Sequence, residues 1–172
     1  STSNGAIVSA VQYTNSGQAA GMTIGGIAYQ GSVTTPVTVS LGYDGLQRVT
    51  TEKAAVRSST LFSQTQTYDN VGNILQLSST VPTTSGSSLT DNQSFCYDGL
   101  NRLVWAGNSG TPISADHCGS TPGGSTTTGY SQSFSYDVLD RITQGTAGTV
   151  SYADATHIHA ATGLSSIPNA YA

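Results

Sequence analysis

The sequence contains few charged side chains. Only 8% of its 172 residues are Asp, Glu, Lys or Arg, whereas soluble globular domains usually carry about 25%. The five basic residues are not clustered, and the net charge is −4. Because binding to nucleic-acid phosphates requires clustered Lys and Arg side chains, the composition argues against a nucleic-acid partner.

Long apolar runs and helical periodicity are also missing. No run of 18 apolar residues exists, so we expect no membrane span. No window sustains apolar residues at i, i+3, i+4 and i+7, so we expect little or no helix. The first ten residues lack the basic region and apolar core of a signal peptide, and the chain begins without Met. We therefore expect a mature product or an excised piece.

Serine, threonine and glycine take the place of the missing charges. The chain has 25 Ser, 25 Thr and 20 Gly, yet 36% of its residues are hydrophobic and nine are Tyr. Disordered chains usually combine low hydrophobicity with high net charge, which does not describe this composition. Thr, Tyr, Val and Ile favour strands, so the sequence predicts an all-β fold.

The two cysteines, Cys96 and Cys118, are 22 positions apart. An even number in a Lys-poor, Ser/Thr-rich chain favours a disulfide formed in an oxidising compartment. Closing a loop of this size would stabilise the fold by about 3 kcal/mol. Two buried free thiols are the alternative.

A seven-residue pattern occurs four times without gaps. It reads Tyr-Asp, any residue, Leu or Val, a turn-type residue, Arg or Asn, and an aliphatic residue. Three of the five basic residues occupy one position of the pattern and four of the nine acids occupy another, which chance does not produce. The repeated positions are Tyr43, Asp44, Arg48, Tyr68, Asp69, Asn73, Tyr97, Asp98, Arg102, Tyr136, Asp137 and Arg141.

Each repeat predicts a β-hairpin. The Asp can accept hydrogen bonds from backbone amides about two residues ahead, which starts a tight turn. The residue three after the Asp should adopt positive φ. Gly72, Asn101 and Asp140 suit that conformation, whereas Gln47 suits it poorly, so we expect a looser first turn.

These units resemble the Tyr-Asp (YD) repeats of the RHS (rearrangement hotspot) family, which includes shells of bacterial toxin complexes and the teneurins. The resemblance implies an all-β, antiparallel YD-repeat β-hairpin ribbon, a segment of a spiral sheet that forms a shell or a fibre. Residues 1–36 would be N-terminal strands and spacer, and 37–172 the repeats of one continuous domain. The units lie around 43–50, 68–75, 97–104 and 136–143, with a degenerate unit at 150–160, and the longer spacings come from polar loop insertions at 78–92 and 107–129 rather than from longer strands.

The repeated side chains allow two interpretations. The tyrosines would form an aromatic ladder for sugars or bases, or would pack between neighbouring hairpins with their hydroxyls bonded locally; in-register tyrosines usually pack, so packing is the prediction. The arginines would bind an anionic ligand or pair with an Asp of their own or the next turn. Pairing is the prediction there.

Motifs for chemistry are scarce. On a strand, His157 and His159 would share a face, but no third metal ligand is evident, and His117 beside Cys118 is no better. No Gly-X-Ser-X-Gly elbow and no Gly-rich phosphate loop occurs. We therefore expect no enzyme, no metal and no cofactor.

Exposed sheet edges carry unpaired amides that invite another strand. Together with the resemblance to YD repeats, this leads us to expect a structural scaffold, located outside a bacterial cell or on its surface, that associates through sheet edges with copies of itself or with adjoining YD repeats. A carbohydrate-binding adhesin module is the alternative. Its ligand aromatics would be Trp105, Tyr130 and Tyr152.

Overall fold

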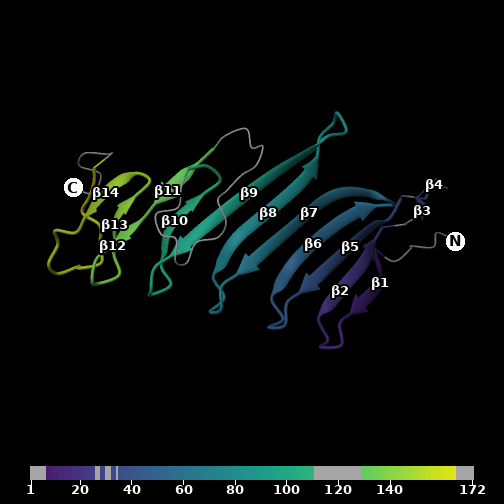
Figure 1. The fold of residues 1–172 in the computed structure, drawn as a ribbon, viewed down its shortest axis with the longest axis horizontal. Helices are drawn as coiled ribbons and strands as arrows, with labels where there is room; N and C mark the ends of the chain where they lie inside the picture. Colours follow the sequence, from purple (N-terminus) through teal and green to yellow (C-terminus); the bar gives the residue numbers. More distant parts are fainter. Residues whose placement is uncertain (1–6, 26–27, 30–31, 34, 111–128, 166–172) are drawn as a thin grey trace. The chain divides into compact units, whose positions relative to one another are not determined.

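The computed structural model describes residues 7–25, 28–29, 32–33, 35–110 and 129–165 (Figure 1). All regular structure in these ranges is antiparallel β-strand and none is helix, which confirms the predicted all-β class. The strands are β1 (Val8–Tyr13), β2 (Ala19–Ile24), β3 (Ala28–Tyr29), β4 (Ser32–Val33), β5 (Val37–Tyr43), β6 (Val49–Val56), β7 (Ser59–Tyr68), β8 (Ile74–Pro82), β9 (Ser88–Tyr97), β10 (Leu103–Gly107), β11 (Ser131–Ser133), β12 (Ser135–Tyr136), β13 (Ile142–Gly145), β14 (Gly148–Ser151) and β15 (Gly163–Leu164).

Hairpins connected in chain order build the sheets. The strand orders are β1-β2-β5-β6-β7-β8-β9-β10-β11, β12-β13-β14-β15 and β3-β4. The described residues divide into two compact units. The first holds those up to Thr67 together with Leu77–Asn92, and the second holds Tyr68–Gln76 and those from Gln93 onward.

In the first unit the strands follow the predicted alternation. In β5, Val37, Val39 and Leu41 are half-buried, whereas Thr38 and Ser40 are exposed. Only a few residues of the strands are fully buried, so this unit is stabilised by many half-buried pairs across strands and not by a large core.

The predicted loop insertion at 78–92 is wrong. Residues up to Pro82 extend β8, residues from Ser88 extend β9, and a tight turn joins the two strands. The hydroxyls of Thr80 and Thr90 lie 3.1 Å apart across the pair. Threonine favours strands because its branched side chain suits a pleated surface, so a Ser/Thr-rich segment lengthened the strands. The central part of the second insertion, 111–128, lies outside the described residues.

The second unit has a small, fully buried core. Trp105 is 1% exposed, and Cys96, opposite it on β9, and Ser94 are 0% exposed. The indole Nε1 of Trp105 donates a hydrogen bond of 2.9 Å to Oγ of Ser131. A Cβ at Gly107 would lie 2.6 Å from the Trp105 ring, so only glycine fits there.

Four hairpins contain the same β-bulge. In each, the Tyr before the turn pairs with the first residue after it, and the next residue of the second strand has no partner opposite. The unpaired residues are Ala20, Thr50, Val104 and Thr143. The repeat therefore extends one residue beyond the pattern visible in the sequence.

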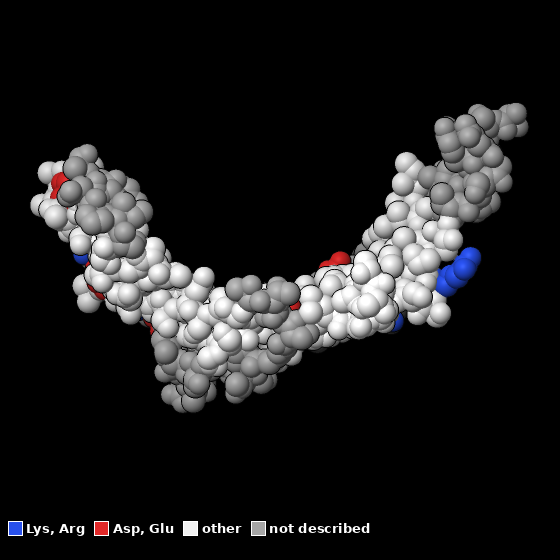
Figure 2. Space-filling view, turned by 90° about the horizontal axis from the view of Figure 1, so that it is seen from above, with Lys and Arg blue, Asp and Glu red and all other residues white. Residues whose placement is uncertain are grey.

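Charged side chains are sparse on the surface as well as in the composition. Figure 2 shows that most of the described atoms on the face it displays belong to neither acidic nor basic residues. The charges that do occur are concentrated at the hairpin turns, where five of the nine acids and four of the five basic residues lie.

Candidate functional site

The turns that carry the repeated residues are the candidate functional site. In the Asp98 turn, the Asp98 amide donates to the carbonyl of Arg102 at 2.9 Å, and the Asn101 amide donates to the carbonyl of Asp98 at 3.0 Å. Asn101 has a φ of 62°. This is a three-residue hairpin loop that ends in a left-handed residue. The turns that begin at Asp44, Asp69 and Asp137 have the same two backbone hydrogen bonds.

The Asp carboxylate holds each turn from inside. Asp98 Oδ1 accepts from the amides of Leu100 at 2.9 Å and Arg102 at 3.0 Å, and Oδ2 accepts from Arg102 Nε at 2.8 Å. Partial burial raises the pKa of the Asp98 carboxyl, but the hydrogen bonds from the Arg102 side chain and the backbone amides outweigh it, so the pKa lies below its ordinary value. The predicted role of Asp in folding the turn is confirmed.

The looser first turn expected at Gln47 is not found. Gln47 adopts a φ of 64°, and its amide donates to the carbonyl of Asp44 at 3.0 Å, as Asn101 does in its own turn. Asp44 accepts the amides of Leu46 and Arg48, both at 2.9 Å. These bonds impose the left-handed conformation on a residue that does not favour it.

Two further turns of the same geometry escaped the sequence pattern. The Thr14 and Thr83 amides donate to the carbonyls of Gln18 and Ser87, and the residues three after the threonines have φ of 84° and 85°. Thr14 Oγ1 accepts the Gln18 amide at 3.1 Å, in the place of an Asp oxygen. Allowing Thr for Asp after the Tyr of the pattern would have found the Thr14 turn, whereas the Thr83 turn also lacks the Tyr, because Pro82 precedes it. Residues 13–19, assigned to the spacer, are therefore a further unit.

The residue four after the Asp or Thr, here called the clamp residue, reaches the following turn. Arg102 shows the full set of contacts: Nη2 lies 2.7 Å from its own Asp98 Oδ2, and Nη1 lies 2.6 Å from Asp140 Oδ1 of the next turn. The predicted Arg–Asp pairing within and between turns is confirmed. The corresponding contacts of other clamp residues are Gln18 Nε2 to Gln47 O (2.8 Å), Asn73 Nδ2 to Asn101 Oδ1 (3.0 Å) and Arg141 Nη1 to Ile158 O (2.5 Å).

The repeated tyrosines bind the preceding hairpin. The hydroxyl of Tyr43 donates to the carbonyl of Ala19 at 2.7 Å, and that of Tyr136 to the carbonyl of Leu103 at 2.8 Å. Both carbonyls belong to the first residue after the preceding turn. The Arg102 guanidinium also lies 4.6 Å from the centroid of the Tyr136 ring. Local packing is thus confirmed for these two tyrosines.

The degenerate unit at 150–160 makes the same contacts. The Tyr152 hydroxyl donates to the carbonyl of Ile142 at 3.1 Å, and the Arg141 guanidinium lies 4.5 Å from the centroid of the Tyr152 ring.

The repeat tyrosine Tyr97 has a raised pKa. Its burial is the larger cause, and the negative charge of Asp69 is the smaller one.

Trp105 cannot serve as an exposed ligand aromatic, which corrects the sequence-based expectation. The bulge at Val104 turns its indole into the core, where only 1% of the residue is exposed. Tyr130 is half-buried, and its hydroxyl donates to Gln93 Oε1 at 2.9 Å. Tyr152 is half-buried beneath Arg141. The three aromatics are therefore engaged within the fold.

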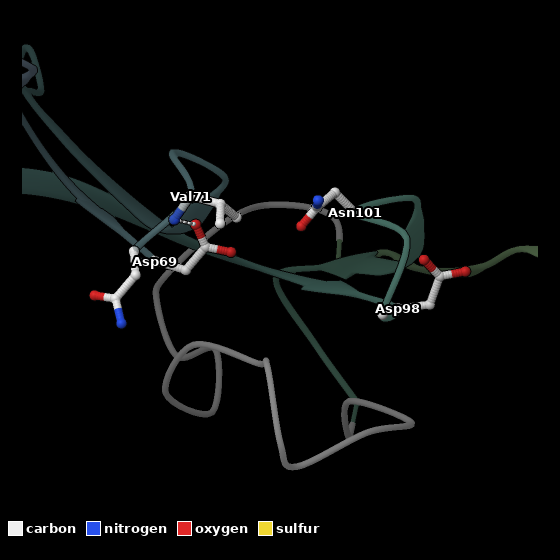
Figure 3. A pocket seen from close by; sticks show the side chains of 6 residues that line it. Asp69, Val71, Asp98 and Asn101 are labelled. Atoms are coloured by element: carbon white, nitrogen blue, oxygen red, sulfur yellow. Dashed lines mark hydrogen bonds between the residues drawn. The ribbon is translucent and has the colours of Figure 1, made fainter.

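Shallow clefts separate successive turns of the second unit. One, of about 270 Å³, lies between the Asp69 and Asp98 turns, where Asp69 Oδ1 already accepts the Val71 amide (Figure 3). Another, of about 430 Å³, lies between the Asp98 and Asp137 turns. The carboxylates of Asp69, Asp98 and Asp137 are bonded within their own turns, and that of Asp140 is paired with Arg102, so these clefts offer little free polar chemistry.

The histidine cluster differs from its expected geometry. Residues 157–159 form a loop rather than a strand, and His157 Nδ1 lies 2.8 Å from Asp154 Oδ2. Hydrogen bonds from the Thr156 hydroxyl and then from His157 lower the pKa of Asp154 to about 2. No group of three or more potential metal ligands occurs among the described residues.

His117 and Cys118 lie outside the described residues. The Cys96–Cys118 disulfide therefore stays a prediction, and the full burial of Cys96 is consistent with either a bridge or an inert thiol.

No family model and no curated protein matches this sequence. The resemblance to YD repeats therefore depends on the residues of the pattern and not on a database relationship. In the described ranges no helix has the length and hydropathy needed to cross a membrane.

Proposed function

We propose that this chain is a structural extracellular β-scaffold of the YD-repeat type, which associates through its sheet edges with copies of itself or with adjoining repeats. The observation that carries the proposal is the repeated contact between hairpins. The hydroxyls of Tyr43, Tyr136 and Tyr152 bind the hairpin before them. The clamp residues Gln18, Asn73, Arg102 and Arg141 reach the turn or loop after them. A hairpin is thereby the binding surface for the next hairpin, so the series can be extended without new chemistry.

The N-terminal edge supports the proposal. β1 is the terminal strand of the nine-stranded order, and within the described residues it pairs with β2 alone. Val8, Val11 and Tyr13 of this strand are 45%, 41% and 66% exposed. An edge strand with apolar side chains and no charge favours pairing with another strand.

Location outside the cell or on its surface is part of the same proposal. It is supported by the Ser/Thr-rich, Lys-poor composition and by the predicted disulfide. The assembled form would be a shell wall or a filament. The adhesin alternative has lost its principal aromatic, because Trp105 is buried.

Light scattering coupled to size-exclusion chromatography, followed by electron microscopy, tests the proposal. The purified chain should form species larger than 17.6 kDa in a concentration-dependent manner, and images should show rings, shells or fibres. A compact monomer at every concentration tested would contradict self-association.

A further inference from the structure

Tyr13 occupies the position of a repeat tyrosine but lacks the contact that the others make. It precedes the Thr14 turn and pairs with Ala19, as Tyr43 pairs with Val49. Tyr43 is half-buried and bonded to the preceding hairpin, whereas Tyr13 is 66% exposed. Within the described residues the Tyr13 hydroxyl makes no hydrogen bond.

The other tyrosines define what Tyr13 would bind. At Tyr43, Tyr136 and Tyr152 the acceptor is the carbonyl of the first residue after the preceding turn, at 2.7, 2.8 and 3.1 Å. The last two rings also stack against the guanidinium of the preceding clamp residue. The surface that fits Tyr13 is thus the second strand of another hairpin of this type.

Building on the proposed scaffold function, we propose that Tyr13 docks on the C-terminal hairpin, β14–β15, of a second copy of this chain. β15 is the terminal strand of the four-stranded order, as β1 is of the nine-stranded one. The contact continues, from copy to copy, the interface that joins hairpins within the chain. Its direction is also the same, since Tyr43, Tyr136 and Tyr152 each bind the hairpin that precedes them in sequence.

The shape of β1 explains why a side chain would set this contact. A bulge lies between Ser9 and Gln12, and Ala10 has a φ of 50°. Bulges interrupt a regular ladder and discourage unspecific strand addition. The Tyr13 contact beside the turn would then fix the register. Because the two surfaces differ, the association is head to tail and propagates into rings or fibres.

Sedimentation velocity over a range of concentrations tests the role of Tyr13. Tyr13→Ala should abolish assembly of the full chain. Tyr13→Phe, which removes only the hydroxyl, should raise the dissociation constant by roughly two- to tenfold. Leu61→Ala, which removes an exposed apolar side chain from β7, should leave assembly unchanged. A monomeric wild type would overturn both the self-association in the scaffold proposal and this inference. Assembly of Tyr13→Ala at wild-type concentrations would overturn the inference alone.

Cysteine cross-linking tests the direction of the contact. Val11→Cys chains, which keep Tyr13 and carry the cysteine at an exposed position of β1, should form a disulfide-linked dimer with Leu164→Cys chains when the two are mixed under mild oxidation, in excess of the wild-type background. Each variant alone should remain at background. Efficient linking of Val11→Cys to itself would show symmetric pairing of β1 with β1 and would overturn the head-to-tail arrangement.

Discussion

The β1–β2 and β9–β10 hairpins have the same backbone and different side chains. Both have a three-residue loop that ends in a left-handed residue, and both have a bulge one residue beyond the pair that closes the hairpin. Behind the bulge, Gln12 lies opposite Gly21 in the first hairpin and Cys96 opposite Trp105 in the second. The backbone geometry therefore does not depend on one set of side chains.

The turns of these hairpins differ in how many bonds the first residue supplies. Thr14 accepts one amide with its hydroxyl, whereas Asp98 accepts two amides and the guanidinium of Arg102. Thr14 is sufficient to form the turn. What the carboxylate adds is an ion pair with the clamp residue, since Gln18 reaches the next turn at the carbonyl of Gln47 without one.

The largest difference between the two hairpins should come from the core. Trp105→Ala removes a fully buried side chain and should lower the free energy of unfolding by about 3–5 kcal/mol. Urea unfolding followed by far-ultraviolet circular dichroism measures this change. Leu100→Ala, at a turn residue that is 67% exposed, is the matched control and should change stability by about 0.5 kcal/mol or less. Equal effects would show that Trp105 is not the core of its unit.

Replacing the first residue of each turn by alanine should distinguish the contribution of the carboxylate from that of the hydroxyl. Asp98→Ala should cost about 1–2 kcal/mol, because two amides and Arg102 lose their acceptor. Thr14→Ala should lower the free energy of unfolding by about 0.5–1 kcal/mol, because only the Gln18 amide loses its acceptor. Urea unfolding of both variants provides the comparison.

Asp98→Asn is the control for that pair. Its carbonyl oxygen still accepts the two amides, but it no longer presents a charge to Arg102, so its loss of stability should fall between wild type and Asp98→Ala. A loss as great as that of Asp98→Ala would place the whole effect in the Arg102 contact and none in the turn amides.

Acid should weaken the Asp turn and leave the Thr turn unchanged. The pKa of Asp98 is lowered in the folded chain, so its contribution to stability is complete above the unfolded value and is lost as pH falls through the folded pKa. The amide resonance of Leu100, bonded to Asp98, should shift with a midpoint below 3.8, and that of Gln18, bonded to Thr14, should not titrate with it. A Leu100 midpoint at or above 3.8 would contradict the bonded carboxylate.

The sequence predicted the parts of the fold that depend on residue identity. The repeated Asp and Arg implied the turns and the pairs between them, because a carboxylate and a guanidinium carry opposite charges and bind each other. The acceptor of Tyr43 is a backbone carbonyl, which any residue provides, so no pattern revealed it. The Thr14 turn was missed because the search required Asp.

The burial of Trp105 was missed for a different physical reason. Strand alternation assigns side chains to faces only while the ladder is regular, and the bulge at Val104 breaks the alternation just before the tryptophan. The bulge recurs with Ala, Thr and Val as its extra residue and has no constant residue type. It could be located only by the pairing of the strands.

The smallest expected effect compares the residues that end the loops. Gln47 has a φ of 64°, a conformation that costs a side chain more than it costs glycine. Gln47→Gly should therefore raise stability by roughly 0.5 kcal/mol, since the strain removed slightly exceeds the added freedom of the unfolded chain. Gly72→Ala, at a φ of 104°, should lower stability. If urea unfolding showed that both variants change the free energy of unfolding in the same direction, the two turns would differ in more than the residue that ends them. Their backbones would then not be equivalent.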